Sequence, residues 1–153
     1  MAAFRGYLLK TTETVNNQVV DVIFPHQYIQ IGTWSTVPNQ REEIKAYRDD
    51  NTRDLTRVTA AGRKTTISFK TRSALNKSQK EAIQTFFTSH ESNAAERKIT
   101  VTYWNDEENT YKSGTFYRPN MTFPILSLRT ILSEDRTSYD IIYDELQIDL
   151  VEY

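Results

Sequence analysis

Residues 98–117 read KITVTYW, NDEEN and TYKSGTFY, and this stretch decides the fold class. In the first and last pieces apolar and small polar side chains alternate, which is the period of a half-buried β-strand, and the middle piece has the composition of a turn. The stretch therefore predicts a β-hairpin. Gly114, inside the second strand, predicts a β-bulge or a close backbone approach, and Pro119 is expected to end the pairing.

Further strands are expected on both sides of this hairpin. Short apolar or alternating runs occupy residues 6–10, 19–24, 28–34, 65–70, 125–129, 138–143 and 145–153, with turns at 15–18 and 133–136. Leu146, Ile148 and Leu150 share one face, but Ile141 has the opposite parity, so a bulge or bend is expected near Asp144. The predicted fold class is therefore mostly β (α+β).

One helix is expected among the strands, over about residues 77–90. Asn76 is the predicted N-cap, and Gln79, three residues later, completes a capping-box pattern. The apolar side chains that recur at helical spacing are Ala82, Ile83, Phe86 and Phe87. This stripe predicts that the helix packs over the sheet as part of the core.

A charged segment without apolar periodicity separates two predicted strands, over about residues 38–64. Twelve of its 27 residues are charged, seven basic and five acidic, and its large apolar residues are Ile44, Tyr47, Leu55 and Val58. Two interpretations fit this segment: a disordered loop, or a long β-hairpin arm that projects past the body and becomes ordered against a neighbour. Alternation over residues 53–59 favours the hairpin.

Length and composition favour a single domain over residues 1–153 with one core. The chain has 19 basic and 20 acidic residues, a net charge of −1, so no overall field would draw it to nucleic acid or to an anionic membrane. Cysteine is absent, which excludes disulfides and thiolate chemistry. Without a signal-peptide pattern or an apolar run of about 18 residues, we expect a soluble protein that is intracellular where it is made.

Residues that carry chemistry are scarce. The two histidines, His26 and His90, are isolated in the sequence, and four glycines in total leave no glycine-rich phosphate loop. Acidic clusters lie at residues 42–43, 49–50 and 106–108, but adjacent acids in polar loops are usually solvated, and none has EF-hand spacing. We therefore expect no enzyme activity and no catalytic, cofactor-binding or metal-binding residues.

The mixed charges of the arm fit protein contacts better than phosphate contacts, because acidic residues are interleaved with the basic ones. Charges of both signs on an extended segment can pair with the same segment of an adjacent copy, and they then set the register and the choice of partner. The alternative is that the arm is a solvated loop.

The order of the expected elements resembles the tail-tube fold of bacteriophage tails, with a long charged excursion between two strands, then a helix, a hairpin and C-terminal strands. The runs Thr100 to Trp104 and Lys112 to Tyr117 resemble a family of small siphophage tail proteins found in prophages. In that family a valine-x-tyrosine strand leads through a polar turn to a lysine-threonine-glycine-x-phenylalanine-tyrosine strand, and Ser113 replaces the threonine here. Segment 120–153 is longer than in that family, which leaves an adaptor or hub position open.

The resemblance implies a tail-tube-like β-sandwich or barrel with a structural role. The protein would form a homo-oligomeric ring, expected to be hexameric, at the tail tube, the distal tail or the hub, beside other phage tail proteins. Genomic DNA would only pass through the lumen, no membrane would be involved, and the virion tail would be assembled in the cytoplasm of the bacterial host. The residues carried over as subunit contacts are Glu42, Arg48, Asp49, Arg53, Asp54 and Arg57.

A carbohydrate-binding module on a β-sandwich is the alternative from a different functional class. It would use as stacking platforms the aromatic residues Trp34, Tyr103, Trp104 and Tyr117. Alternation places Trp104 opposite Tyr103, so only one of the two can face solvent. Such side chains are more often anchors in a core or an interface, which favours the structural protein.

Overall fold

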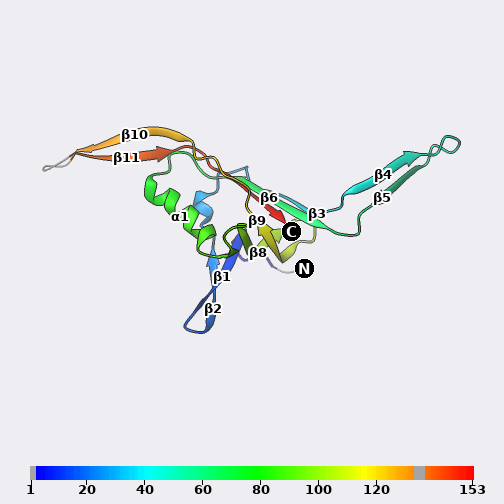
Figure 1. Ribbon diagram of the computed structural model, residues 1–153, viewed down its shortest axis with the longest axis horizontal. Coiled ribbons are helices and arrows are strands. Elements are labelled where there is room, and N and C mark those ends of the chain that lie inside the picture. Colours follow the sequence, from blue (N-terminus) through cyan, green and yellow to red (C-terminus); the bar gives the residue numbers. More distant parts are fainter. Residues whose placement is uncertain (1–2, 133–136) are drawn as a thin grey trace.

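Antiparallel β-strands make up most of the molecule, and an α-helix lies beside them (Figure 1). The computed structural model describes residues 3–132 and 137–153. The elements in these residues are β1 (Leu9–Val15), β2 (Gln18–Ile23), a 3-10 helix η1 (His26–Tyr28), β3 (Ser35–Gln40), β4 (Glu43–Arg48), β5 (Leu55–Thr59), β6 (Lys64–Lys70), α1 (Lys77–Thr88), β7 (Glu91–Asn93), β8 (Lys98–Asn105), β9 (Thr110–Tyr117), β10 (Ile125–Leu132), β11 (Thr137–Tyr143) and β12 (Gln147–Glu152). The predicted class, mostly β with one packed helix and a long hairpin arm, is confirmed.

The strands form one large antiparallel sheet and two separate hairpins, β4–β5 and β10–β11. The order in the large sheet is β2-β1-β8-β9-β12-β6-β3, with β7 paired to β8. Two of its junctions are short, because β1 meets β8 over Leu9 and Lys10, and β12 meets β9 over Val151 and Glu152. Strands joined over so few residues can turn sharply relative to each other, so the sheet encloses one core in a sandwich-like arrangement.

The hairpin predicted at residues 98–117 is confirmed as β8–β9. Its register runs without interruption from Lys98 opposite Tyr117 to Asn105 opposite Thr110. In the turn, the side-chain oxygen of Asn105 accepts the backbone N–H groups of Glu107 and Glu108. Of the two expectations for Gly114, the bulge is wrong, because the register is continuous there, and the close approach is made by the Glu152 side chain instead of by a backbone.

Gly114 leaves room for a carboxylate that ties two strands together. A Cβ atom at position 114 would lie 2.9 Å from Glu152 Oε1 and 3.0 Å from Phe116 Cε2. The other oxygen of Glu152 accepts the backbone N–H of Thr65 at 2.8 Å. We expect Gly114→Val to displace this carboxylate, leave the Thr65 N–H unpaired and cost about 1–3 kcal/mol in the free energy of unfolding, measured by urea denaturation.

Gly62 provides the matched control for this substitution, because a Cβ atom there meets no atom within 4 Å. Gly62→Val should change the free energy of unfolding by less than about 0.5 kcal/mol. In a chain that already carries Glu152→Ala, the cost of Gly114→Val should shrink, because the carboxylate is gone. Equal costs in both backgrounds would show that the glycine and Glu152 are not coupled.

The strand predicted at residues 28–34 is wrong. The chain there forms η1 and a following turn, in which the Thr33 N–H donates to the Gln30 carbonyl, and only an isolated bridge links Ile29 to Thr71. Gly32 has a φ of +81°, which a strand does not contain, and Ile31 is 100% exposed. The apolar alternation is real, but the turn places its side chains outside any sheet.

Helix α1 begins at the predicted N-cap. The Asn76 side chain accepts the Gln79 N–H at 2.9 Å, and the Gln79 side chain accepts the Asn76 N–H at 3.1 Å, so the capping box is confirmed. The helix buries Ile83, Phe86 and Phe87 against the sheet, as its apolar stripe predicts, whereas Ala82, the fourth member of that stripe, is exposed. Among the described residues, no helix is long and apolar enough to cross a membrane.

The C-terminal strand β12 lies in the middle of the large sheet, between β9 and β6. Leu146, Ile148 and Leu150 are fully buried, as their alternation predicts. The change of parity near Asp144 occurs where the chain leaves the β10–β11 hairpin, since β11 ends at Tyr143 and β12 belongs to the large sheet. The expected pairing of β10 with β11 is confirmed, and the turn predicted at 133–136 lies outside the described residues.

Candidate subunit interface

The β4–β5 hairpin, which we call the arm, extends away from the large sheet at one end of the longest axis (Figure 1). Its strands pair with each other and form a sheet of their own. None of the buried core residues found in the described chain lies between positions 41 and 63. A two-stranded hairpin without a core is at best marginally stable in water, so the arm is poorly stabilised by its own contacts.

The arm exposes large apolar side chains as well as charges. Leu55 is 51% exposed and Tyr47 is 49% exposed, and the remaining two are Ile44 and Val58. Sequence reasoning treated these four residues only as too few to form a core, and assigned the contacts to charged residues. The signal for them is the alternation within each strand, which places each apolar side chain beside a polar neighbour on the opposite face.

The register of the arm sorts its side chains onto two faces. Arg48 lies opposite Leu55 and Ala46 lies opposite Arg57, so these side chains share the first face. Glu43 joins them, because its carboxylate contacts the Arg57 guanidinium at 2.6 Å. We call this surface the arginine face.

The second face, which we call the tyrosine face, begins with Lys45 opposite Val58 and continues with Tyr47 opposite Thr56. The Lys45 ammonium lies 5.0 Å from the centre of the Tyr47 ring, as expected for neighbours on one face. A register shift between Glu43 and Lys45 separates this face from Glu43. By alternation, the face extends toward the tip through the next pair, in which the Asp49 N–H donates to the Asp54 carbonyl.

The tip of the arm is shaped by Asp49. Its carboxylate accepts the backbone N–H groups of Asn51 and Thr52 at 2.8 and 2.9 Å, and these two bonds, that of Thr52 foremost, hold the pKa of Asp49 below its usual range. Arg53 adopts a left-handed φ of 64°, and its carbonyl accepts a hydrogen bond from the Arg48 guanidinium. These contacts are local, so they order the turn without tying it to the body.

The six residues predicted as subunit contacts lie on both faces of the arm, at its tip and at its root. Arg48 and Arg57 lie on the arginine face, and Asp54 lies on the tyrosine face close to the tip. Asp49 pairs with Asp54 where the tyrosine face meets the tip, and both Asp49 and Arg53 bond to other arm residues there. Glu42 lies at the root, and its carbonyl accepts the Ala60 N–H at 2.8 Å. The structure therefore brings five of the six together beyond the root.

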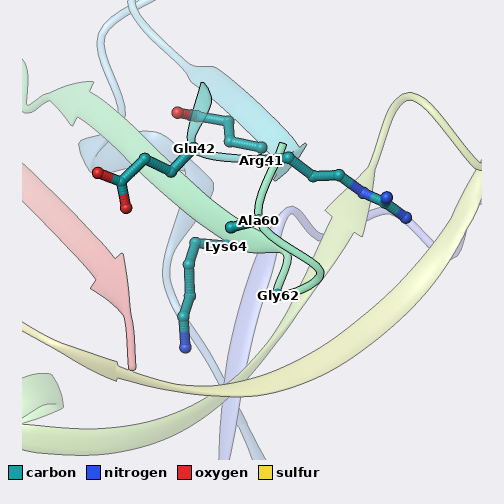
Figure 2. A pocket seen from close by; sticks show the side chains of 6 residues that line it. Arg41, Glu42, Ala60, Gly62 and Lys64 are labelled. Carbon is teal, nitrogen blue, oxygen red and sulfur yellow. The ribbon is translucent and has the colours of Figure 1, made fainter. Parts of the chain in front are cut away.

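The root of the arm encloses a shallow depression. Its lining residues are Gln40, Arg41, Glu42, Ala60, Gly62 and Lys64. Figure 2 shows that the side chains of Arg41, Glu42 and Lys64 point in different directions. The Lys64 ammonium donates to the carbonyl of Tyr153. These polar groups do not converge on one point, so the depression lacks the geometry of a small-molecule site.

A second projection, the β10–β11 hairpin, extends at the opposite end of the longest axis (Figure 1). Its exposed apolar residues include Leu128, which is 74% exposed, and Tyr139, which is 78% exposed. The sequence predicts the pairing of these strands but not their departure from the body. Leu128 and Tyr139 were therefore missed as surface residues.

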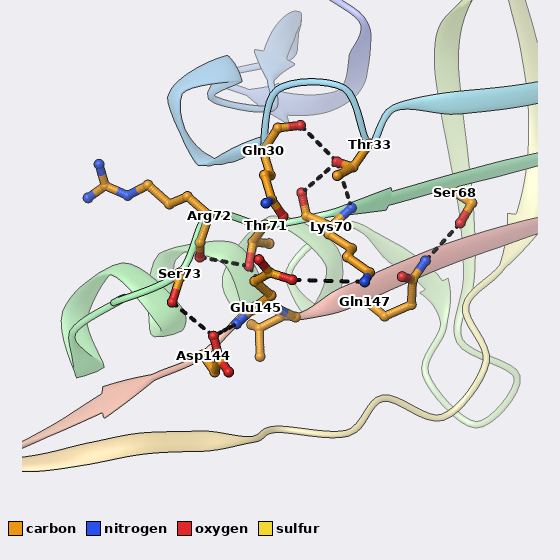
Figure 3. A network of polar contacts seen from close by, with 11 residues as sticks. Gln30, Thr33, Ser68, Lys70, Thr71, Arg72, Ser73, Asp144, Glu145 and Gln147 are labelled. Atoms are coloured by element: carbon orange, nitrogen blue, oxygen red, sulfur yellow. Dashed lines mark hydrogen bonds and ion pairs between the residues drawn. The ribbon is translucent and has the colours of Figure 1, made fainter.

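The root of this second hairpin is held by polar contacts to the chain before α1 (Figure 3). The Ser73 hydroxyl donates to the Asp144 carboxylate at 2.8 Å, and this carboxylate also accepts the Glu145 N–H. These bonds, that of the Glu145 N–H foremost, hold the pKa of Asp144 below its usual range. Leu75 and Tyr143 exchange two backbone hydrogen bonds at 2.7 and 3.0 Å, which fixes the end of β11.

The two histidines lie far from each other in the chain, and the contacts found for His90 are structural. His90 lies just after the end of α1, with Nδ1 2.7 Å from the Phe86 carbonyl and Nε2 3.1 Å from the Glu13 carboxylate. Among residues 3–132 and 137–153, no three metal-binding side chains gather at one point.

The four aromatic residues of the carbohydrate alternative lie in separate environments. Tyr103 is buried, and its hydroxyl lies 3.1 Å from the Thr65 hydroxyl. Trp34 packs on a core phenylalanine, Trp104 is covered by Phe4 and Tyr111, and Tyr117 packs on Tyr153. They do not form one flat platform for a sugar.

Comparison with known proteins gives one match. The model of a family of unknown function (DUF6711) matches residues 1–153. No curated protein and no solved structure matches the chain. The match therefore includes the arm and the β10–β11 hairpin, but the description of the family assigns no activity.

Proposed function

The chain belongs to this family of unknown function, and we propose that it is a structural subunit of a bacteriophage tail that forms a ring and bridges neighbouring copies through its arm. The observation that carries the proposal is the arm itself. It is a hairpin outside the core that exposes apolar side chains on both faces. A partner that covers these faces would supply the stabilisation that the hairpin lacks.

The charges of the arm support a protein partner. Between residues 43 and 59 the chain carries four basic and four acidic side chains, interspersed along the arm. A nucleic acid would meet as many acidic as basic groups there, whereas a protein surface of matching pattern can pair with both. The chain as a whole has a net charge of −1, so it does not repel further copies of itself strongly.

The positions of the two projections favour a head-to-tail assembly. The arm and the β10–β11 hairpin extend at opposite ends of the molecule (Figure 1). When one surface of a subunit contacts a different surface of the next, the contact repeats, and the assembly closes into a ring if the rotation permits. A ring is therefore a natural product of contacts made by such an elongated subunit.

The resemblance of the β8–β9 hairpin and of the order of elements to siphophage tail proteins supplies the biological setting. In that setting the ring is hexameric and lies at the tail tube, the distal tail or the hub, next to other tail proteins. Genomic DNA passes through the lumen without a specific site. The subunit is assembled in the cytoplasm of the bacterial host and ends in the virion.

The mass of the purified protein in solution tests this proposal. We expect closed rings of about six subunits, seen by light scattering and in negative-stain images. Raising the salt concentration should weaken the assembly, because part of the contact is between exposed charges. A chain that stays monomeric at every accessible concentration, alone and with tail proteins, and that binds glycans instead, would contradict the proposal.

A further inference from the structure

We propose that the arms of adjacent copies stack face to face, with the arginine face of one arm on the tyrosine face of the next. This inference rests on the proposed function, because it names the surface through which the copies meet. It commits to a second copy of this chain as the partner of the arm.

The two faces carry opposite net charge. The arginine face has Arg48 and Arg57 against Glu43, a net charge of +1. The tyrosine face has Asp49 and Asp54 against Lys45, a net charge of −1. Stacking unlike faces therefore brings opposite charges together, whereas stacking two like faces would bring like charges together.

Both faces also offer apolar contact area next to their charged side chains. Leu55 on the arginine face and Tyr47 and Val58 on the tyrosine face are each about half exposed. Such side chains can interdigitate when two sheets pack at about 10 Å. Apolar side chains beside charged ones have the composition of a specific protein interface, in which charge fixes the orientation and the apolar contact supplies affinity.

The shape of the arm suits such a stack. It is a single ribbon of two strands, so neighbouring arms can approach to the spacing of two packed sheets, which the thicker body cannot do. Because each arm uses one face toward each neighbour, the contact repeats in one direction around a ring. We therefore expect the arms to converge while the bodies of the subunits remain further out.

Two charge-reversal variants and their mixture test the stacking. Arg48→Glu changes the net charge of the arginine face from +1 to −1, and Asp54→Lys changes that of the tyrosine face from −1 to +1. Each variant alone then has two faces of the same sign, and we expect the concentration needed for half-assembly to rise about tenfold or more. In an equimolar mixture, unlike faces alternate again, and assembly should recover.

Charge reversals elsewhere on the surface are the matched controls. Arg72→Glu and Glu107→Lys alter exposed side chains outside the arm and should leave the half-assembly concentration within about twofold of the wild-type value. Thermal unfolding should show that all four variants keep the melting temperature of the body. Recovery in the mixture separates lost complementarity from a hairpin that fails to form, because a hairpin that fails to form does not recover.

The outcomes distinguish this inference from the proposed function. A wild-type chain that never assembles overturns the proposed function and the stacking with it. A wild-type chain that assembles, with variants that assemble equally well or with a mixture that does not recover, overturns the stacking and leaves the ring-forming function standing. Assembly that is lost in both variants and recovered in the mixture supports the stacking.

Discussion

Replacing residues 42–59 by Asn-Gly is expected to leave a folded chain that no longer forms oligomers. The buried core contains no residue of the arm, so the melting temperature should stay within about 3 °C of that of the full chain at concentrations too low for assembly. The same deletion removes both faces through which copies are proposed to meet. Circular dichroism melting and light scattering on one sample measure the two effects separately.

The deletion needs a control that also removes exposed apolar area. Ile31 lies in the turn after η1, outside the arm, and is fully exposed. Ile31→Ala should leave assembly unchanged, because a single exposed side chain in a turn is not part of the arm. Oligomers that persist after the arm is removed would show that the arm is a passive loop, and the subunit contact would have to be sought elsewhere, for example on the β10–β11 hairpin.

Local patterns in the sequence predicted the elements that depend on neighbouring residues. The capping box from Asn76 to Gln79 defines the start of α1 through bonds between residues three apart. The β8–β9 hairpin is closed by a five-residue segment that Asn105 begins, and its alternation is unbroken on both sides. In both cases the residues that define the element lie within a few positions of the helix start or the turn that they form.

The incorrect predictions concern positions where the local sequence pattern favours one structure and the tertiary structure imposes another. Residues 28–34 alternate like a strand, but Pro25 and Gly32 allow a 3-10 turn and a left-handed residue that end any extended pairing. At Gly114, a missing side chain could mean a bulge or a neighbour lying close above it. Only the fold shows that the neighbour is Glu152, which is 38 residues away in sequence.

The candidate interface was predicted in part. Charge composition located the arm, and its status as a hairpin is confirmed. The division into two faces could not be predicted, because the register shift between Glu43 and Lys45 changes the parity in one strand only. Leu55 and Tyr47 lie on opposite faces because Arg48 pairs with Leu55 and Tyr47 pairs with Thr56, and this register depends on the turn at the tip.

The substitution Phe24→Ala is expected to have the largest effect on stability. Phe24 is 1% exposed, and its ring centre lies 5.3 Å from that of Phe69 on β6 and 5.0 and 6.0 Å from those of Phe86 and Phe87 on α1. Removing the ring leaves a cavity between the sheet and the helix. We expect a loss of about 3–5 kcal/mol in the free energy of unfolding, or roughly 6–20 °C in melting temperature.

Phe4→Ala is the matched control, because it removes the same atoms from a side chain that is 54% exposed and packs on Trp104. Its cost should stay near 1 kcal/mol. Both substitutions are best measured in the chain that lacks the arm, since assembly adds a stabilisation that depends on concentration. Similar losses for the two variants would show that Phe24 does not lie at the centre of the core.

Phe24→Ala and the removal of the arm should therefore act on different quantities. The first lowers the free energy of unfolding, but it should leave the half-assembly concentration of the full chain unchanged at temperatures where the body stays folded. Removal of the arm should abolish assembly but leave the free energy of unfolding of the body unchanged. This separation is expected because the core lies between the large sheet and α1, whereas the arm forms its own sheet outside it. If Phe24→Ala also weakened assembly at low temperature, the arm would have to depend on the packing of the core.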